Sequence, residues 1–245
     1  NLDWKAKNAR WLRWETCRLC EQDHHGVVMC ALGWACWKTY VGRPGGDWAR
    51  RRAMTLLGIG LMRANHHEDA LSVQEAQLAT MRRVGDSEER ILVVQSNLAC
   101  AYESLGRLQD GLRIRQDVYA RRLELLGEEK KQTLQTAYNY AATLKDLHRD
   151  DEAKSLLCKY IPVARRVLGE SHELTLNLRK VYALALSRDA GATLDDLREA
   201  LDTLEDAGRI ARRVFGGAHP LTGSVERSLR NAQATLRARE TSRGA

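Results

Sequence analysis

The feature that most constrains the fold is a repeat of 42 residues in the middle of the chain. Three glycines end helical patterns at this interval, with 127 − 85 = 42 residues between Gly85 and Gly127 and 169 − 127 = 42 between Gly127 and Gly169. A Thr-Leu pair follows two of them in the same register, at 133–134 and 175–176. A period of this size is typical of stacked helical hairpins, each of which buries its apolar face against its neighbours. The repeat therefore predicts an all-α array.

Apolar residues inside the repeat follow helical spacing. One stripe with steps of 4, 3 and 4 residues consists of Val94, Leu98, Ala101 and Leu105. This spacing places the side chains on one face of a helix. We expect four hairpins and a capping helix, with helices at 48–64 and 68–84, 91–105 and 109–126, 134–147 and 151–168, 176–187 and 194–215, and 222–239. The glycine that ends the fourth hairpin, Gly217, comes later, at 217 − 169 = 48 residues, which predicts a longer turn around 187–191.

Small residues recur twelve positions apart, where the two helices of a hairpin must approach closely. The pairs are Gly58 with Ala70, Ala99 with Gly111, and Ala141 with Ala153. Residues 168–176 read Leu-Gly-Glu-Ser-His-Glu-Leu-Thr-Leu, and 215–222 are a variant of this phrase. In these features the chain resembles the tetratricopeptide repeats of kinesin light chains over residues 49–240. The resemblance implies a right-handed α-solenoid of about four hairpins with a C-terminal capping helix.

The same resemblance implies a function and a set of binding residues. In this family the first helix of each hairpin lines a concave groove that receives a peptide or a helix of a partner protein. Asn97 and Asn139, which are 42 residues apart, occupy the position of a family asparagine that bonds the backbone of the bound peptide. Arg122 matches a family arginine near the end of a second helix. The alternative is that the asparagines bond a neighbouring helix instead.

Signatures of an enzyme are missing from the sequence. Gly58 and Gly60 lack the third glycine of a dinucleotide-binding fingerprint, and His66-His67-Glu68 lacks the second histidine of a metalloprotease. There is no phosphate-binding loop and no serine elbow. We therefore expect a non-catalytic scaffold whose repeats need no cofactor.

The opening of the chain differs in composition from the repeat. All six tryptophans lie at or before Trp48, and Trp4, Trp11 and Trp14 fit a short basic helix. We expect the end of a truncated zinc finger at 1–25, a connecting helix and Gly/Pro linker at 26–48, and a disordered tail at 241–245. The chain opens at Asn1 without a methionine, so we also expect sequence upstream of it.

Cys17 and Cys20 are the candidate zinc ligands of this opening. With Trp11 and Trp14 before them, they resemble the closing cysteine pair of a RING-CH finger, the type found in ubiquitin ligases. That resemblance implies a substrate-recruiting part of a ligase as the alternative function. With His25 and Cys30 added, the pattern becomes Cys-x2-Cys-x4-His-x4-Cys, the spacing of a zinc knuckle. A third interpretation is that no metal binds.

Composition bounds the partners. The net charge is +7, but 39 basic residues are interleaved with 32 acidic ones, a pattern typical of a solvated face more than of a nucleic-acid-binding surface. The longest apolar run, at 27–37, is too short to span a membrane. Six cysteines without a disulfide framework or a signal peptide predict a reducing, cytoplasmic location. The expected partners are proteins or peptides.

Overall fold

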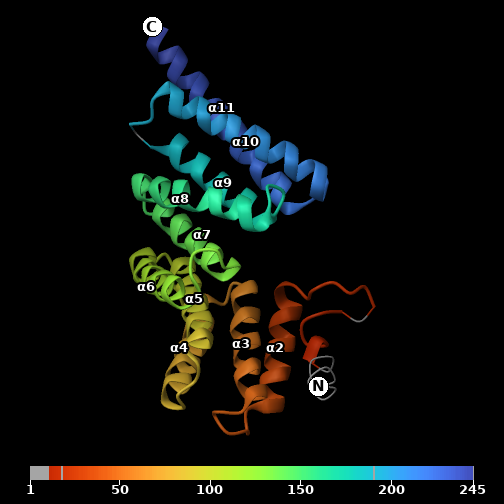
Figure 1. Ribbon diagram of the computed structural model, residues 1–245. Coiled ribbons are helices and arrows are strands. Elements are labelled where there is room, and N and C mark those ends of the chain that lie inside the picture. Colours follow the sequence, from red (N-terminus) through yellow and green to blue (C-terminus); the bar gives the residue numbers. More distant parts are fainter. Residues whose placement is uncertain (1–10, 18, 190, 245) are drawn as a thin grey trace. The chain divides into compact units, whose positions relative to one another are not determined.

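The computed structural model describes residues 11–17, 19–189 and 191–244, and the side chains of all but 242–244 of these. Within these residues every regular element is a helix (Figure 1). The helices are α2 (Gly26–Tyr40), α3 (Trp48–Arg63), α4 (His67–Arg83), α5 (Glu88–Ser104), α6 (Leu108–Leu126), α7 (Lys131–Asp146), α8 (Asp150–Leu168), α9 (Glu173–Arg188), α10 (Leu194–Phe215) and α11 (Pro220–Gly244). They pack in sequential hairpins, as in a tetratricopeptide solenoid, which confirms the predicted all-α class. Trp4 lies outside the described residues.

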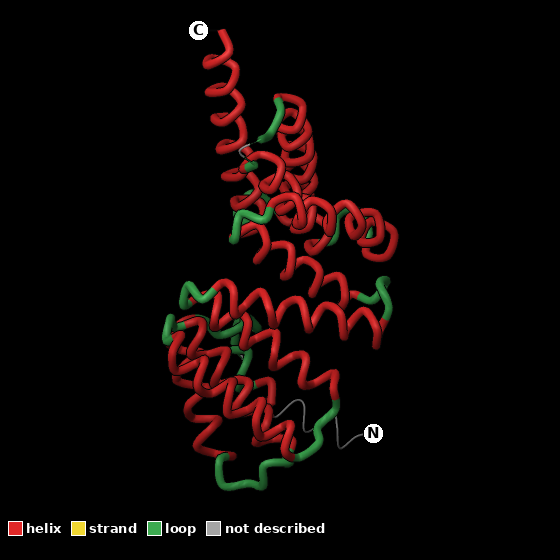
Figure 2. The backbone as a smooth tube through the Cα atoms, turned by 90° about the vertical axis from the view of Figure 1, so that its left-hand side faces the viewer, coloured by secondary structure: helices red, strands yellow, loops and turns green. Residues whose placement is uncertain are grey.

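The helices belong to two compact units whose division falls inside α6, between Ile114 and Arg115. In unit 1, α2 packs on α3, α3 on α4 and α4 on α5. In unit 2 each helix from α7 to α11 packs on the next, and α9 also packs on α7 and α11. Short loops join the helices (Figure 2). Contacts between neighbours along the chain therefore dominate each unit, as expected for hairpins that stack in order.

The repeated glycines end helices because they adopt backbone angles that other residues avoid. Gly127 and Gly169 have φ angles of 77° and 93°, in the region where a side chain would be strained. In the fourth hairpin this residue is Gly216, with φ 85°, and not the predicted Gly217. The longer turn of this hairpin is present but runs from 189 to 193, because α9 continues to Arg188.

The histidines and threonines of the repeated phrase bind backbone atoms at the helix junctions. Nδ1 of His172 accepts the N–H of Leu174 at 3.0 Å, and so caps the start of α9. His219 accepts the N–H of Leu221 at 3.2 Å in the same way. The Thr175 hydroxyl donates back to the carbonyl of Ala164 in the preceding helix, at 3.4 Å. The phrase thus specifies the junction between one hairpin and the next.

Small residues lie where helices approach closely, as predicted from their spacing. Ala70, Ala99, Ala141 and Ala153 have no exposed surface. A Cβ added to Gly111 would lie 3.3 Å from the carbonyl oxygen of Ala99, tighter than ordinary contact.

The capping helix is longer than predicted. α11 continues to Gly244, through the segment 241–244 in which the sequence predicted a disordered tail. No proline interrupts this segment, and its only glycine is the last helical residue, so nothing in its composition breaks the helix. No helix in the described part of the chain combines the length and apolar character that a membrane crossing needs.

Candidate binding site

Unit 1 contains a pocket of about 300 Å³ between α3 and α5, the first helices of its two hairpins. Residues of α4 also contribute to its wall. The apolar lining consists of Trp48, Leu56, Ile59, Met81, Val93 and Val94. Trp48 and Val93 are 41% and 43% exposed, so a bound group could reach them directly. The pocket therefore offers an apolar surface that a partner side chain could fill.

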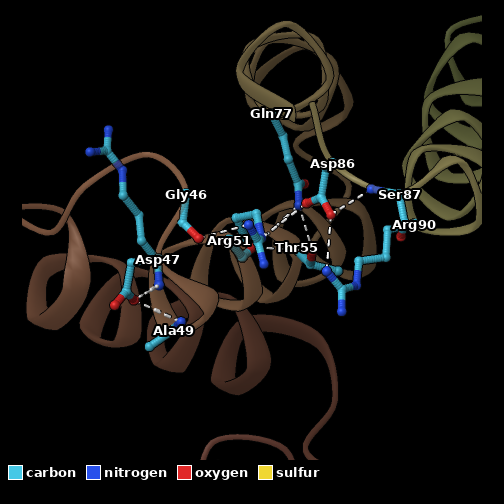
Figure 3. A network of polar contacts seen from close by, with 10 residues as sticks. Gly46, Asp47, Ala49, Arg51, Thr55, Gln77, Asp86, Ser87 and Arg90 are labelled. Carbon is cyan, nitrogen blue, oxygen red and sulfur yellow. Dashed lines mark hydrogen bonds and ion pairs between the residues drawn. The ribbon is translucent and has the colours of Figure 1, made fainter. Parts of the chain in front are cut away.

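A polar network fixes the two helices beside this pocket (Figure 3). Asp86, in the turn before α5, has a side chain that is only 3% exposed. Its carboxylate lies 3.1 Å from Nε of Arg51 on α3 and 3.0 Å from Nη1 of Arg90 on α5. Burial would raise the pKa of this carboxyl, but the N–H of Ser87 and the two guanidinium groups outweigh it and hold the pKa below its ordinary value. Asp86 is thus a charged joint between the two hairpins.

Gln77 connects the two helices of the first hairpin at the same place. Its side chain is 3% exposed, and Nε2 donates to the hydroxyl of Thr55 at 2.7 Å and to the carbonyl of Arg51 at 3.2 Å. A buried amide with satisfied donors makes a well-defined contact, because leaving it unpaired would cost free energy. Arg51 is therefore held through both its main chain and its side chain.

An aromatic cluster orients the side of the pocket near the start of α3. The rings of Trp11 and Trp48 meet edge to face, with centroids 5.2 Å apart. Oε1 of Glu15 accepts the indole N–H of Trp11 at 3.1 Å and lies 2.8 Å from Nη2 of Arg52. The guanidinium of Arg52 in turn lies over the Trp48 ring, 5.9 Å from its centroid. The residues before the repeat thus help to build the pocket, a role that the sequence analysis did not anticipate.

Asn97 lies one turn along α5 from the pocket. Arg90, Val93, Val94 and Asn97 are three or four residues apart, so they share one face of the helix. The side chain of Asn97 is half-buried and makes no hydrogen bond within the described part of the chain. Its amide is consequently available to a ligand, as the predicted groove role requires.

The other two predicted groove residues belong to unit 2. Asn139 is half-buried on α7, and its Oδ1 accepts a hydrogen bond from Nε2 of Gln135 at 3.2 Å. Arg122 is buried and donates from Nη1 to the carbonyl of Gln132 at 3.2 Å, across the junction from α6 to α7. This contact gives Arg122 a structural role at the junction, and binding of a partner by Asn139 and Arg122 stays a prediction.

The cysteine pair lies in a tight hairpin before α2. Thr16 and Asp23 form an antiparallel bridge, and the N–H of Cys17 donates to the carbonyl of Gln22 at 2.8 Å. The N–H groups of Cys20 and Leu19 point at the sulfur of Cys17 and lower the pKa of its thiol.

The zinc-knuckle set is not assembled in this arrangement. Among the residues whose side chains are described, no three His, Cys, Asp or Glu side chains lie close enough together to hold a metal ion. Cys17, Cys20, His25 and Cys30 are therefore not brought together, although two of them, Cys17 and Cys20, are neighbours. Two thiolates supply half of a closed tetrahedral zinc site, so a zinc ion here would need further ligands. Zinc binding stays a prediction.

Sequential hairpins, capping glycines and small residues at the helix contacts define a tetratricopeptide-like repeat fold. Solved structures share it. A kinesin light chain protein of nearly identical TPR-like repeats from Podosopora anserina is 21% identical, with a TM-score of 0.65 over 80% of this chain and 90% of that one. BtubC (BKLC) from P. vanneervenii is 16% identical, with a TM-score of 0.60 over 87% of this chain and 88% of that one.

A third similar structure contains a ligand. It is a Rap protein complexed with competence and sporulation factor, 16% identical, with a TM-score of 0.52 over 86% of this chain and 59% of that one. Neither a protein-family model nor a curated protein matches this chain. At these identities the similarity defines the fold alone.

Proposed function

We propose that the chain is a protein–protein interaction scaffold, and that the face formed by α3 and α5 in unit 1 binds an extended peptide or a helix of a partner. The observation that carries this proposal is the apolar pocket between the two first helices, with the amide of Asn97 one turn away. An apolar pocket selects a side chain, and a neighbouring amide can both donate to and accept from a peptide backbone.

The rigidity of this face supports the same function. Arg51, Asp86 and Arg90 hold the two helices through charged contacts, so the pocket is present before a ligand arrives. A site that is already formed loses less conformational entropy on binding. The similar Rap structure, which is complexed with competence and sporulation factor, gives an example of a repeat fold of this kind with a bound factor.

The proposal is tested by selecting peptides from a random display library on the whole chain and then measuring their affinity for Asn97→Ala. The lost hydrogen bonds should weaken binding by about 0.5–1.5 kcal/mol each, while the melting temperature stays nearly unchanged. Asn139→Ala is the matched variant in unit 2, and the same loss there would extend the site to α7. A large loss of stability with unchanged affinity would show that these asparagines are internal structural contacts.

The cysteine hairpin favours a second candidate function, a substrate-recruiting part of a RING-CH ubiquitin ligase. Its support is the pairing of Cys17 with Cys20 in a turn whose N–H groups point at the Cys17 sulfur. Metal analysis of the purified chain tests it, with weak or no zinc binding expected until upstream sequence is added. One tightly held zinc that disappears in His25→Ala would instead support a knuckle and nucleic-acid binding.

A further inference from the structure

A second pocket lies in unit 2, at the end where α7 and α9 finish and α8 begins. It has a volume of about 220 Å³ and is lined by His148, Asp150, Asp151, Arg188 and Asp189. Arg188 and Asp189 reach it because the turn between α9 and α10 is longer than the turns of the other hairpins. The departure from the 42-residue period thus builds a polar site that the regular repeat would not contain.

The carboxylate of Asp150 is the unusual group in this pocket. The residue is 8% exposed, and its Oδ1 is buried without a hydrogen-bond partner. No ion pair or hydrogen bond of this side chain occurs within the part of the chain that the structure describes. By contrast, the carboxylates of Asp151 and Asp189 lie 2.7 Å and 2.9 Å from Nζ of Lys154. Buried polar groups normally have a partner, so Asp150 is poised for one that comes from outside.

The charges around Asp150 favour a cation. Three carboxylates, those of Asp150, Asp151 and Asp189, face two cations, Lys154 and Arg188, and Lys154 is already occupied by two of the carboxylates. The C-terminal end of α9, with its partial negative charge, points to the same place. Burial and the nearby Asp189 carboxylate raise the pKa of Asp150, which a positive ligand would reverse.

The chemistry of the lining indicates which cation. In the described residues no group of three acidic, histidine or cysteine side chains could hold a metal ion. A pocket of this volume with one unpaired carboxylate oxygen instead suits a compact nitrogen cation on an alkyl stem. We propose that this pocket binds an alkylammonium group, such as the side chain of a lysine on a partner protein. The site is separate from the α3–α5 face and does not depend on the function proposed for it.

The test is an amide NMR titration of the whole chain with N-acetyl-lysine methylamide. Saturable shifts are expected at the amides of His148, Asp151 and Asp189, and none with the uncharged N-acetyl-norleucine methylamide. Asp150→Asn should weaken binding by about tenfold or more, because a neutral amide loses the charge attraction. Asp195→Asn is the matched control, since this carboxylate is 90% exposed on α10 and lies outside the pocket lining, and it should bind like the wild type.

Two further arms decide between explanations. Arg188→Ala should bind the probe more tightly, because a competing positive charge is removed. If Arg188 is itself the partner of Asp150 in solution, the wild type will not bind and only Arg188→Ala will, and this result would overturn the proposal. Equal binding by Asp150→Asn and the wild type would also overturn it. Butylamine as a second probe separates the two sources of the ligand, since tighter binding of the lysine derivative indicates a protein partner and equal binding a free amine.

Discussion

Nε of Arg51 lies 3.1 Å from Oδ2 of Asp86, and this ion pair joins the first helix of one hairpin to the turn before the next. Asp86 also contacts Arg90, so one nearly buried carboxylate holds both helices that line the pocket of unit 1. The geometry of the candidate binding face thus depends on a residue in a turn. The predictions below follow from contacts of this kind.

Replacing Asp86 with alanine should destabilise unit 1 by about 1–3 kcal/mol, because the side chain of Arg51 loses its partner in a mostly buried setting. The free energy of unfolding in urea measures this loss. Asp110→Ala is the matched control, since it removes an exposed pair with Arg107 that should contribute only about 0–1 kcal/mol. Equal losses in the two variants would contradict a special role for Asp86.

The cap formed by His172 predicts a pH-dependent stability of unit 2. Burial, followed by the charge of Lys131, holds the pKa of this histidine below its ordinary value of 6.5. The folded state therefore binds fewer protons than the unfolded state near this pH. The contribution of His172 is complete above pH 6.5 and is lost as the pH falls through 6.5 toward the lower folded pKa.

His172→Asn separates this effect from other titrations. Asparagine is also a good N-cap residue, because its side-chain oxygen can accept a backbone N–H, but it does not titrate. Unfolding free energies measured between about pH 7 and about pH 5 should fall more steeply for the wild type than for the variant. Parallel curves would show that the cap does not respond to pH.

The contact between α2 and α3 predicts opposite effects for two glycine substitutions. A Cβ at Gly60 would lie 2.7 Å from the carbonyl oxygen of Met29 and 2.9 Å from Cα of Cys30, so Gly60→Ala should force the helices apart. A loss of about 1–3 kcal/mol is typical of such overpacking. Gly208→Ala, in α10, meets only Cγ1 of Val225 at 3.6 Å and should gain up to about 1 kcal/mol from helix propensity. Thermal unfolding measures both, and a gain at Gly60 would contradict the close contact.

Much of the fold could be predicted from the sequence because it depends on local rules. Glycines with positive φ, apolar stripes and small residues at a fixed spacing act within one hairpin or between neighbours, so their positions along the chain suffice. Gly127 and Gly169 illustrate this, since both follow directly after predicted helices. The exception is the last hairpin, where Gly216 and Gly217 are adjacent and only the backbone angle distinguishes them.

The sites were less predictable, because they combine residues whose distance depends on how helices cross. Asp86 and Arg51 are 35 residues apart, and no periodic pattern relates them. The same holds for Trp11 and Trp48, whose ring contact joins the opening of the chain to α3. Asp150 carried no signal in the sequence, since its lack of a partner follows from the longer turn after α9. The family resemblance indicated Asn97 but not the pocket beside it.

The most direct test of the central claim, that the α3–α5 face binds partner peptides, is the affinity of a selected peptide for Val93→Glu. Val93 is 43% exposed in the pocket, and Val214, on α10, is 47% exposed elsewhere, so Val214→Glu is a matched control. The account predicts that Val93→Glu weakens binding by about tenfold or more, at an unchanged melting temperature, while Val214→Glu binds normally. Unchanged affinity in Val93→Glu would contradict it.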